Sequence, residues 1–211
     1  MAGKKPNRGL VALFAALAIA GLGALGYAKL VRPNIVPKNF GVVDAGKLYR
    51  SGRLTPSATR EVVEANHIKT IVDLGAYDLS PSGERVAEHT ASALGVERRV
   101  FRLSGDGTGN PNAYVEALRI IADPAKQPVL VHCSAGSERT GACVLLYREI
   151  VQGHAPGADL GETYSHGHDP SRNTRMKPYL EQWRAKIAEA LRAGTSIDGQ
   201  PRAEIVSPAR E

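Results

Sequence analysis

One short segment of the sequence carries residue types and spacing suited to chemistry on phosphate. It follows an apolar run and reads His132-Cys133-Ser134-Ala135-Gly136-Ser137-Glu138-Arg139-Thr140-Gly141. A loop of small residues between a strand and a helix can turn several backbone N–H groups toward one anion, and the helix dipole adds to the attraction. We therefore predict a phosphate-binding loop made of Ser134, Ala135, Gly136, Ser137, Glu138 and Arg139.

The side chains at the two ends of this loop have the matching reactivity. Cys133 begins it, and the same electrostatic field favours the thiolate, which is a competent nucleophile. Arg139 closes it, and a guanidinium can hold two phosphate oxygens in a bidentate fork. Thr140 follows, where its hydroxyl can hydrogen-bond the sulfur and ease the departure of the sulfur in a second step. The segment therefore predicts phosphoryl transfer to a cysteine.

An alternation of strands and helices is expected to position the loop. The run 128–131 is wholly apolar and rich in β-branched residues, which is typical of a buried central strand in a parallel sheet. N-cap residues followed by proline indicate where helices begin. The patterns predict strands at 40–44, 48–50, 68–74, 96–103 and 128–131, and helices at 55–67, 82–94, from 110, 139–152 and 177–193. The fold class is α/β, with a mostly parallel sheet flanked by helices.

The chain divides into five segments by composition. A basic stretch, 1–9, precedes 10–28, which is free of charge and long enough for a transmembrane or signal-anchor helix. The proline-containing segment 29–38 is expected to be an extended linker. The catalytic domain is expected at 39–193, and the polar, non-periodic tail 194–211 is expected to be disordered.

The amino-terminal charges suggest where the domain is located. Basic residues before 10–28 favour an inside amino terminus and an extracytoplasmic domain. Cleavage near Gly26-Tyr27-Ala28 would instead release the domain as a secreted protein. The bases among residues 1–38 account for the whole formal net charge of +6, so residues 39–211 hold 21 basic and 21 acidic side chains. This neutrality argues against a nucleic-acid partner, and 2 cysteines exclude a disulfide scaffold.

The pattern His-Cys-x5-Arg-Thr-Gly after an apolar strand resembles the signature of the cysteine-dependent protein tyrosine and dual-specificity phosphatases. The resemblance covers about 39–192 and includes Leu48-Tyr49-Arg50-Ser51-Gly52-Arg53-Leu54, which is similar to an opening found in small bacterial and fungal-type members. It implies attack by the thiolate of Cys133, a cysteinyl-phosphate intermediate, and stabilisation of the phosphoryl group by Arg139. It also implies an aspartate that protonates the leaving oxygen, and neither a metal nor a cofactor.

Asp106 is the first candidate for that acid. It lies 27 residues before Cys133 in the glycine-rich segment 104–109, directly after an expected strand, where a loop that closes over substrate would be placed. Its alternative role is that of an Asp-Gly turn former. Asp73 and Asp78 are the next candidates, and of these Asp73 is expected instead to cap or orient a neighbouring loop.

Other residues whose side chains could take part in chemistry are expected to have structural roles. His132 is expected to be a buried donor that holds the loop, and Cys143 to be a core residue. The cluster of His154, His166, His168 and Asp169 could ligate zinc or copper, but solvated loop histidines are preferred because the spacing of a dependable metal site is missing.

The expected substrate is a phosphorylated protein or a small phosphomonoester, with the oligomeric state open. Ser134, Ser137 and Glu138 stand where phosphoinositide-directed members carry basic residues, which disfavours very highly charged head groups. The alternatives are a phosphoinositide or other small-molecule phosphatase and a phosphate-binding pseudophosphatase. A sulfur-transfer enzyme is disfavoured by the Arg-Thr-Gly closure of the loop.

Overall fold

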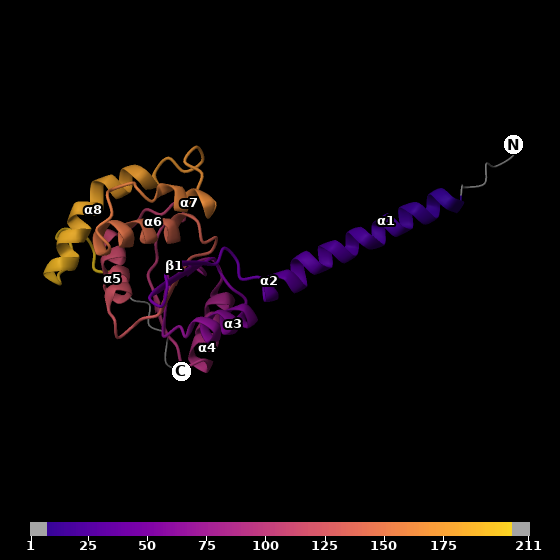
Figure 1. Cartoon of the computed structure of the whole chain (residues 1–211), viewed down its shortest axis with the longest axis horizontal. Coiled ribbons are helices and arrows are strands. Elements are labelled where there is room, and N and C mark those ends of the chain that lie inside the picture. The colour runs from indigo at the N-terminus through magenta and orange to yellow at the C-terminus, as the bar shows by residue number, and fades with distance from the viewer. Residues whose placement is uncertain (1–7, 204–211) are drawn as a thin grey trace.

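A five-stranded sheet forms the centre of the structure, a computed structural model that describes residues 8–203 (Figure 1). The strand order is β1-β2-β5-β3-β4; β1 is antiparallel to β2, and the other neighbours are parallel. The strands are β1 (Gly41–Asp44), β2 (Leu48–Ser51), β3 (Thr70–Asp73), β4 (Glu97–Val100) and β5 (Val129–His132). The predicted α/β class and the central position of the strand before Cys133 are confirmed.

Helices cover both faces of this sheet. One core lies between the sheet and helices α3 (Pro56–Asn66) and α4 (Pro81–Ala93). A larger core lies on the other face, beneath α5 (Pro111–Ala122), α6 (Glu138–Leu146) and α8 (Met176–Ala193). Figure 1 shows these two groups of helices on opposite sides of the strands. Because β5 is covered on both faces, its apolar side chains are buried throughout.

Two helices begin at the capped positions that the sequence predicts, and α4 begins at Pro81, one residue before its predicted start. The side chains of Thr55, Ser80 and Asn110 each accept a hydrogen bond from a backbone N–H of the first turn, and a proline follows each cap. A proline fits at this position because its missing N–H would have no partner inside the helix and its fixed φ suits the helix. These local signals fix the orientation of α3, α4 and α5 against the sheet.

Several expectations on the carboxyl-terminal side are corrected. The helix expected over 139–152 ends at Leu146 and continues as a π-helical turn, η2 (Tyr147–Val151). A short helix, α7 (Leu160–Ser165), is present where only a loop was expected; it buries a single residue, so it has no apolar stripe to reveal it. The tail begins with an ordered stretch, because Ile197 is buried and its N–H donates to Asn112 Oδ1 at 2.7 Å.

The amino-terminal segment also differs from expectation. It forms α1 (Arg8–Gly26), a π-helical turn η1 (Tyr27–Val31) and α2 (Arg32–Ile35), so the expected extended linker is partly helical. Pro33 is compatible with helix here because it stands in the first turn.

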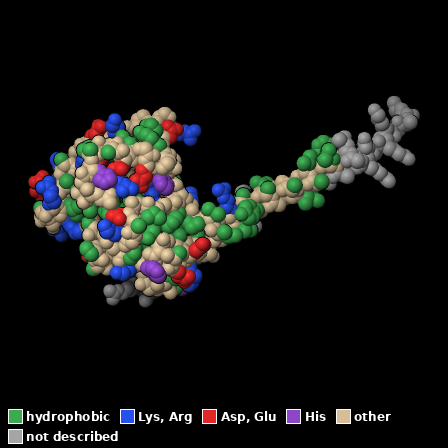
Figure 2. Space-filling model, in the orientation of Figure 1, with side chains coloured by type: hydrophobic (Ala, Val, Ile, Leu, Met, Phe, Trp, Pro, Cys, Tyr) green, Lys and Arg blue, Asp and Glu red, His purple; other side chains and the backbone are tan. Residues whose placement is uncertain are grey.

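The first helix extends away from the rounded body as a rod that carries hydrophobic side chains (Figure 2). Within residues 8–203, none of the helices combines the length and the apolar character needed to cross a membrane. The expected span over 10–28 is therefore not supported; α1 includes Arg8 at its start and several glycines. The location of the domain and the cleavage of the segment stay predictions.

A buried leucine tests the larger core. Leu146 at the end of α6 is fully buried, whereas the side chain of Leu79 is fully exposed. Leu146→Ala should lower the free energy of unfolding by about 2–5 kcal/mol because it removes buried methyl groups and leaves a cavity. Leu79→Ala should change it by less than about 0.5 kcal/mol. Urea denaturation of both variants measures the difference, and equal losses would show that the packing around α6 is wrong.

Candidate active site

The predicted phosphate-binding loop lies at the carboxyl edge of the parallel strands. We call residues 133–139 the cysteine loop; it leaves the end of β5 and enters α6 at Glu138. The loops after β2, β3 and β4 leave the sheet at this same edge, because parallel strands share their direction. The arrangement brings the ends of three loops, residues 50–53, 74–79 and 103–105, to the edge of the sheet where the cysteine loop begins. Cys133 itself is only 2% exposed.

The first carbonyl groups of the cysteine loop are held by donors outside it. The carbonyl of Ser134 accepts from the backbone N–H of Arg53 at 3.1 Å and from Nζ of Lys38 at 3.0 Å. The carbonyl of Ala135 accepts from Nδ2 of Asn39 at 3.3 Å. Asn39 adopts a left-handed φ of 51°, which an asparagine tolerates better than most residues. These carbonyls therefore face away from the loop interior.

The carbonyl of Gly136 is also held by a donor outside the cysteine loop. Gly136 O accepts from Nη2 of the buried Arg50 at 2.8 Å. In a trans peptide the N–H points opposite to the preceding carbonyl, so three outward carbonyls leave the next three N–H groups facing inward. The N–H of Gly136 donates to Cys133 Sγ at 3.2 Å, in agreement with this orientation. The loop thus presents a row of donors around the sulfur, which is an anion site.

Arg139 is anchored on one side only. Its Nη1 donates to the carbonyls of Leu74 at 2.9 Å and Gly75 at 2.5 Å, and it lies 3.4 Å from Asp78 Oδ2. Its Nε is buried and has no hydrogen-bond partner within residues 8–203. A buried donor without a partner is costly, so a phosphate oxygen in the loop would satisfy it. The guanidinium is therefore oriented in advance of binding.

A cleft of about 440 Å³ opens over this arginine. Its lining includes Arg53, Asp78, Leu79, Ser134 and Arg139. Burial raises the pKa of Asp78, although the positive charges of Arg139 and Arg102 oppose the change. The cleft thus contains a cationic end and one carboxyl group with an increased tendency to hold a proton.

Asp106 lies outside this cleft. It lines a neighbouring cavity with Glu138 and Arg175, and only the adjacent Gly105 lines both. Its Oδ1 accepts from the N–H and the hydroxyl of Thr108, at 3.1 and 2.7 Å, and its Oδ2 lies 3.2 Å from Nη1 of Arg175. Burial tends to raise the pKa of Asp106, but these hydrogen bonds and the arginine charge hold it below the usual value. The structure does not bring the first candidate acid to the cysteine.

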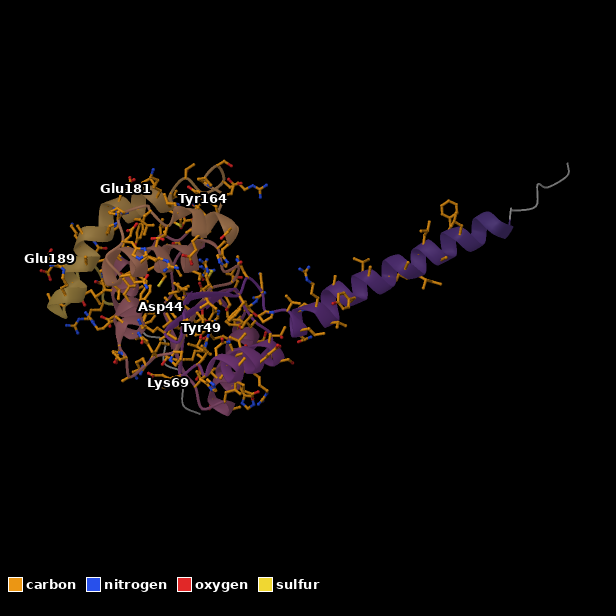
Figure 3. The ribbon with its side chains drawn as sticks, in the orientation of Figure 1. Asp44, Tyr49, Lys69, Tyr164, Glu181 and Glu189 are labelled. Carbon is orange, nitrogen blue, oxygen red and sulfur yellow. The ribbon has the colours of Figure 1, made fainter. Side chains whose placement is uncertain are left out.

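Glu138 takes part in a cluster that sequence reasoning missed. Its Oε2 accepts from Nδ2 of Asn173 at 2.5 Å and lies 2.7 Å from Nδ1 of His168. Asn173 also donates to the carbonyl of Asp106 at 2.7 Å. The ring of Tyr164, labelled on α7 in Figure 3, stacks on the ring of His168. The expectation of solvated histidines is therefore wrong for His168, which is buried because the short helix α7 covers it.

The other histidines of the proposed metal cluster do not converge with it. Nδ1 of His166 lies 2.8 Å from Oδ1 of Asn39, and Nδ1 of His154 lies 2.8 Å from Oδ2 of Asp159. Within the described part of the chain, no group of three or more His, Cys, Asp or Glu side chains is placed to hold a metal ion. Each histidine instead has its own polar partner.

Several buried polar side chains lie close to the cysteine loop without a hydrogen bond to it, so the expectation that His132 holds this loop stays a prediction. Nε2 of His132 lies 3.5 Å from Oδ2 of Asp73, and burial lowers the pKa of His132. Asp73 Oδ1 accepts from the N–H of Ala76 at 2.6 Å, so this carboxylate orients the loop after β3 as expected. The hydroxyl of Thr140 is buried and has no partner within residues 8–203. Cys143 is a core residue, and burial raises its pKa to about 12.

Comparison with known proteins identifies the family of the chain. Residues 39–178 match the family model described as "DSP-PTPase phosphatase fused to NAD+ Kinase", which is more than half of the 211 residues. The chain belongs to this family, which is part of the cysteine-based DSP and PTP superfamily. The resemblance noted in the sequence is confirmed.

Two curated relatives and one solved structure illustrate the range of the family. "Inositol diphosphatase DSP1" of rice is 30% identical over 122 residues, covering 55% of this chain and 51% of that protein. "Tyrosine-protein phosphatase-like protein OCA2" of Saccharomyces cerevisiae is 30% identical over 125 residues, covering 56% and 60%. The chain therefore spans about half to three fifths of the curated relatives it matches. A structure of P. aeruginosa TpbA in complex with pTyr has a TM-score of 0.59 at 21% identity, covering 78% of this chain and 94% of that one.

A matched pair of glycine substitutions tests the shape of the loop. Gly136 and Gly46 both have positive φ, but a Cβ on Gly136 would lie 2.6 Å from the backbone nitrogen of Gly52, whereas a Cβ on Gly46 meets nothing. Gly136→Ala should therefore lower kcat/KM for a phosphomonoester by about 10²-fold because the inward N–H groups are displaced. Gly46→Ala should cost only about 1 kcal/mol of stability and leave the kinetics unchanged. Similar kinetic losses in both variants would contradict this geometry.

Proposed function

We propose that this protein is a protein tyrosine or dual-specificity phosphatase that works through a cysteinyl-phosphate intermediate. One observation carries the proposal: the carbonyls of 134–136 are held outward, so the loop directs its N–H groups at Cys133 beside the partly unpartnered Arg139. Such donors match the three equatorial oxygens of a transferring phosphoryl group. The same geometry argues against a pseudophosphatase, because both the nucleophile and the guanidinium are in place.

The proposed reaction has two steps. The thiolate of Cys133 attacks phosphorus, the S–P bond forms, the bond to the leaving oxygen breaks, and an aspartic acid gives that oxygen a proton. A water molecule then attacks phosphorus and gives a proton to the same carboxylate, the S–P bond breaks, and inorganic phosphate leaves. The role of Thr140 toward the departing sulfur stays a prediction, because its buried hydroxyl has no hydrogen-bond partner within residues 8–203, the sulfur of Cys133 included.

We assign the acid role to Asp106 and a supporting role to Asp78. Asp106 follows Gly105, which lines the cleft, so a local rearrangement of the 104–109 loop that releases Arg175 brings this carboxyl toward the leaving oxygen. Conformational steps of this kind are common when a loop closes over substrate. Asp78 instead lies against Arg139, where it orients the guanidinium.

The substrate class follows from the loop side chains and the cleft. Ser134 and Ser137 are neutral, and Glu138 is bound by His168 and Asn173, so no cation projects from the five residues between Cys133 and Arg139. This favours a phosphate on a neutral or apolar group such as phosphotyrosine, and the exposed Leu79 offers an apolar contact at the cleft. The structure of TpbA in complex with pTyr supports this proposal, because it is a protein of similar fold with phosphotyrosine bound.

A second candidate is an inositol diphosphate or another small phosphate ester. It is favoured by relatives in rice and Arabidopsis thaliana that are inositol diphosphatases. It is also favoured by Arg53 and Arg139, which both line the cleft. Two guanidinium groups at one cleft suit a substrate with more than one phosphate. The two classes therefore differ in whether Arg53 contacts the substrate.

The decisive experiment measures phosphate release in EDTA. Phosphotyrosine peptide, phosphothreonine peptide and an inositol diphosphate are supplied to the full chain and to Cys133→Ser. We expect turnover of the phosphotyrosine peptide by the parent chain and none by Cys133→Ser, because a serine hydroxyl is far too weakly acidic to replace the thiolate. The variant should keep the fold and the ability to bind phosphate. Preference for the inositol diphosphate would establish the second candidate, and residual turnover in Cys133→Ser would exclude the covalent route.

Leaving-group dependence separates the two aspartates. Asp106→Asn should slow hydrolysis of phenyl phosphate by roughly 10²–10⁴-fold and slow nitrophenyl phosphate much less, because nitrophenolate departs without a proton. Asp78→Asn should slow both substrates by the same factor, since it acts through Arg139. Steady-state rates on the two esters make the measurement. A leaving-group effect in Asp78→Asn together with a uniform one in Asp106→Asn would assign the proton to Asp78.

A further inference from the structure

We propose that Arg50 is a positioning residue of this phosphatase: its buried guanidinium fixes the cysteine loop from behind and supplies a second positive charge to the thiolate of Cys133. Its meaning for catalysis rests on the proposed function, but its physical effect on the thiol does not. Arg50 belongs to the stretch 48–54, which carries part of the family resemblance. The proposed reaction gives Arg50 no role.

The sheet places Arg50 beneath the loop. In β2 it pairs with Val131 of β5, and the next residue pairs with His132, so Arg50 lies beside the strand end that delivers Cys133. Side chains alternate along a strand, which puts Arg50 on the same face as Leu48, toward the larger core. Its exposure is 0%, so this guanidinium is enclosed by protein.

The hydrogen bonds of Arg50 are incomplete. Only Nη2 has a partner at hydrogen-bond distance, the carbonyl of Gly136 at 2.8 Å, whereas Nε and Nη1 are buried without one in the described chain. Charged groups are buried only when they are paired, because desolvation is costly. An enclosed guanidinium with two unused nitrogens therefore indicates a further negative partner.

The carboxylate of Glu162 supplies only part of that compensation. Its Oε1 lies 3.6 Å from Nη1 of Arg50, while its Oε2 accepts from Nε of Arg148 at 2.8 Å. The side chain of Glu162 is also 21% exposed, so solvent weakens its field. Burial lowers the pKa of Arg50, and the negative charges of Glu162 and Cys133 oppose that change.

The remaining partner that the structure offers to Arg50 is the sulfur of Cys133. Cys143 is also close enough to act on Arg50, but burial raises its pKa to about 12, so it is a neutral thiol at neutral pH. Cys133 begins a loop whose N–H groups face inward, and the carbonyl of Gly136 is held by Arg50 itself. One guanidinium thus supports both the shape of the anion site and the charge on its nucleophile.

The test is the pH dependence of Cys133 alkylation by iodoacetamide, followed by mass spectrometry on the full chain. Arg50→Met should slow alkylation at pH 6 by about tenfold and leave the rate at pH 9.5 nearly unchanged, since loss of a neighbouring positive charge disfavours the thiolate. Arg50→Lys should recover most of the rate at pH 6, because it keeps the charge. Inorganic phosphate should protect the parent chain from alkylation more strongly than it protects Arg50→Met or Arg50→Lys, because both variants lack the Nη2 group that donates to the carbonyl of Gly136.

A second pair of variants leaves Arg50 in place. Glu162→Gln removes the competing anion, so alkylation at pH 6 should become about two- to threefold faster. Asp159→Asn is the matched control, because Asp159 also lies near Arg148, at 3.9 Å, and has no contact with Arg50. It should leave alkylation unchanged.

The outcomes separate this inference from the proposed function. A folded Arg50→Met with the parent's alkylation profile overturns the inference. If that variant unfolds in thermal melts, the pair Glu162→Gln and Asp159→Asn decides, and identical behaviour of the two overturns it. A shifted profile in a chain that hydrolyses none of the phosphate esters would support Arg50 while removing the proposed function.

Discussion

The orientation of three successive peptide groups, between residues 134 and 137, is the constraint on which the site depends. A backbone turned this way cannot satisfy its own carbonyls, so the surrounding protein must supply donors for them. Lys38, Asn39, Arg50 and the backbone of Arg53 do so. The edge of the sheet is organised around this requirement, since β2 ends where these donors are needed and the segment before β1 folds back to supply the others.

The same requirement explains how an acidic residue is tolerated in an anion-binding loop. Glu138 would repel phosphate if it faced the sulfur, but its carboxylate is bound by His168 and Asn173 on the other side of the loop. Glu138 stands in the first turn of α6, where a negative charge interacts favourably with the helix dipole. The side chains between Cys133 and Arg139 are neutral apart from the acidic Glu138. The groups that face the sulfur are nevertheless backbone N–H donors and the guanidinium of Arg139.

The parts of the site that are contiguous in sequence could be predicted, and the parts that meet across the fold could not. The signature at 132–141, the central strand before it and the capped helices are local patterns, and the fold class followed from them. Arg50 and Asn39 contact the loop from 86 and 96 residues away. Asn39 carries no signal beyond being polar near a strand, and the family resemblance includes the stretch around Arg50 without showing that its guanidinium reaches Gly136. The positions of the two aspartates depend on how loops after different strands lie at one edge, so chain order favoured Asp106 while the folded cleft contains Asp78. The helix α7 was missed because it buries one residue.

The amide of Asn173 connects three segments: the loop that contains Asp106, the cysteine loop and the start of α8. It donates both to Glu138 in the loop and to the backbone carbonyl of Asp106, while its own oxygen accepts from the N–H groups of Arg175 and Met176 at the start of α8. A displacement of Asp106 toward the cleft therefore exchanges a hydrogen bond at a junction that also begins the longest helix of the catalytic body. In the proposed reaction this exchange adds to the cost of moving Asp106 to the cleft, together with the loss of its contacts to Thr108 and Arg175. The start of α8 would then influence how readily Asp106 moves, as the glycines that flank it do.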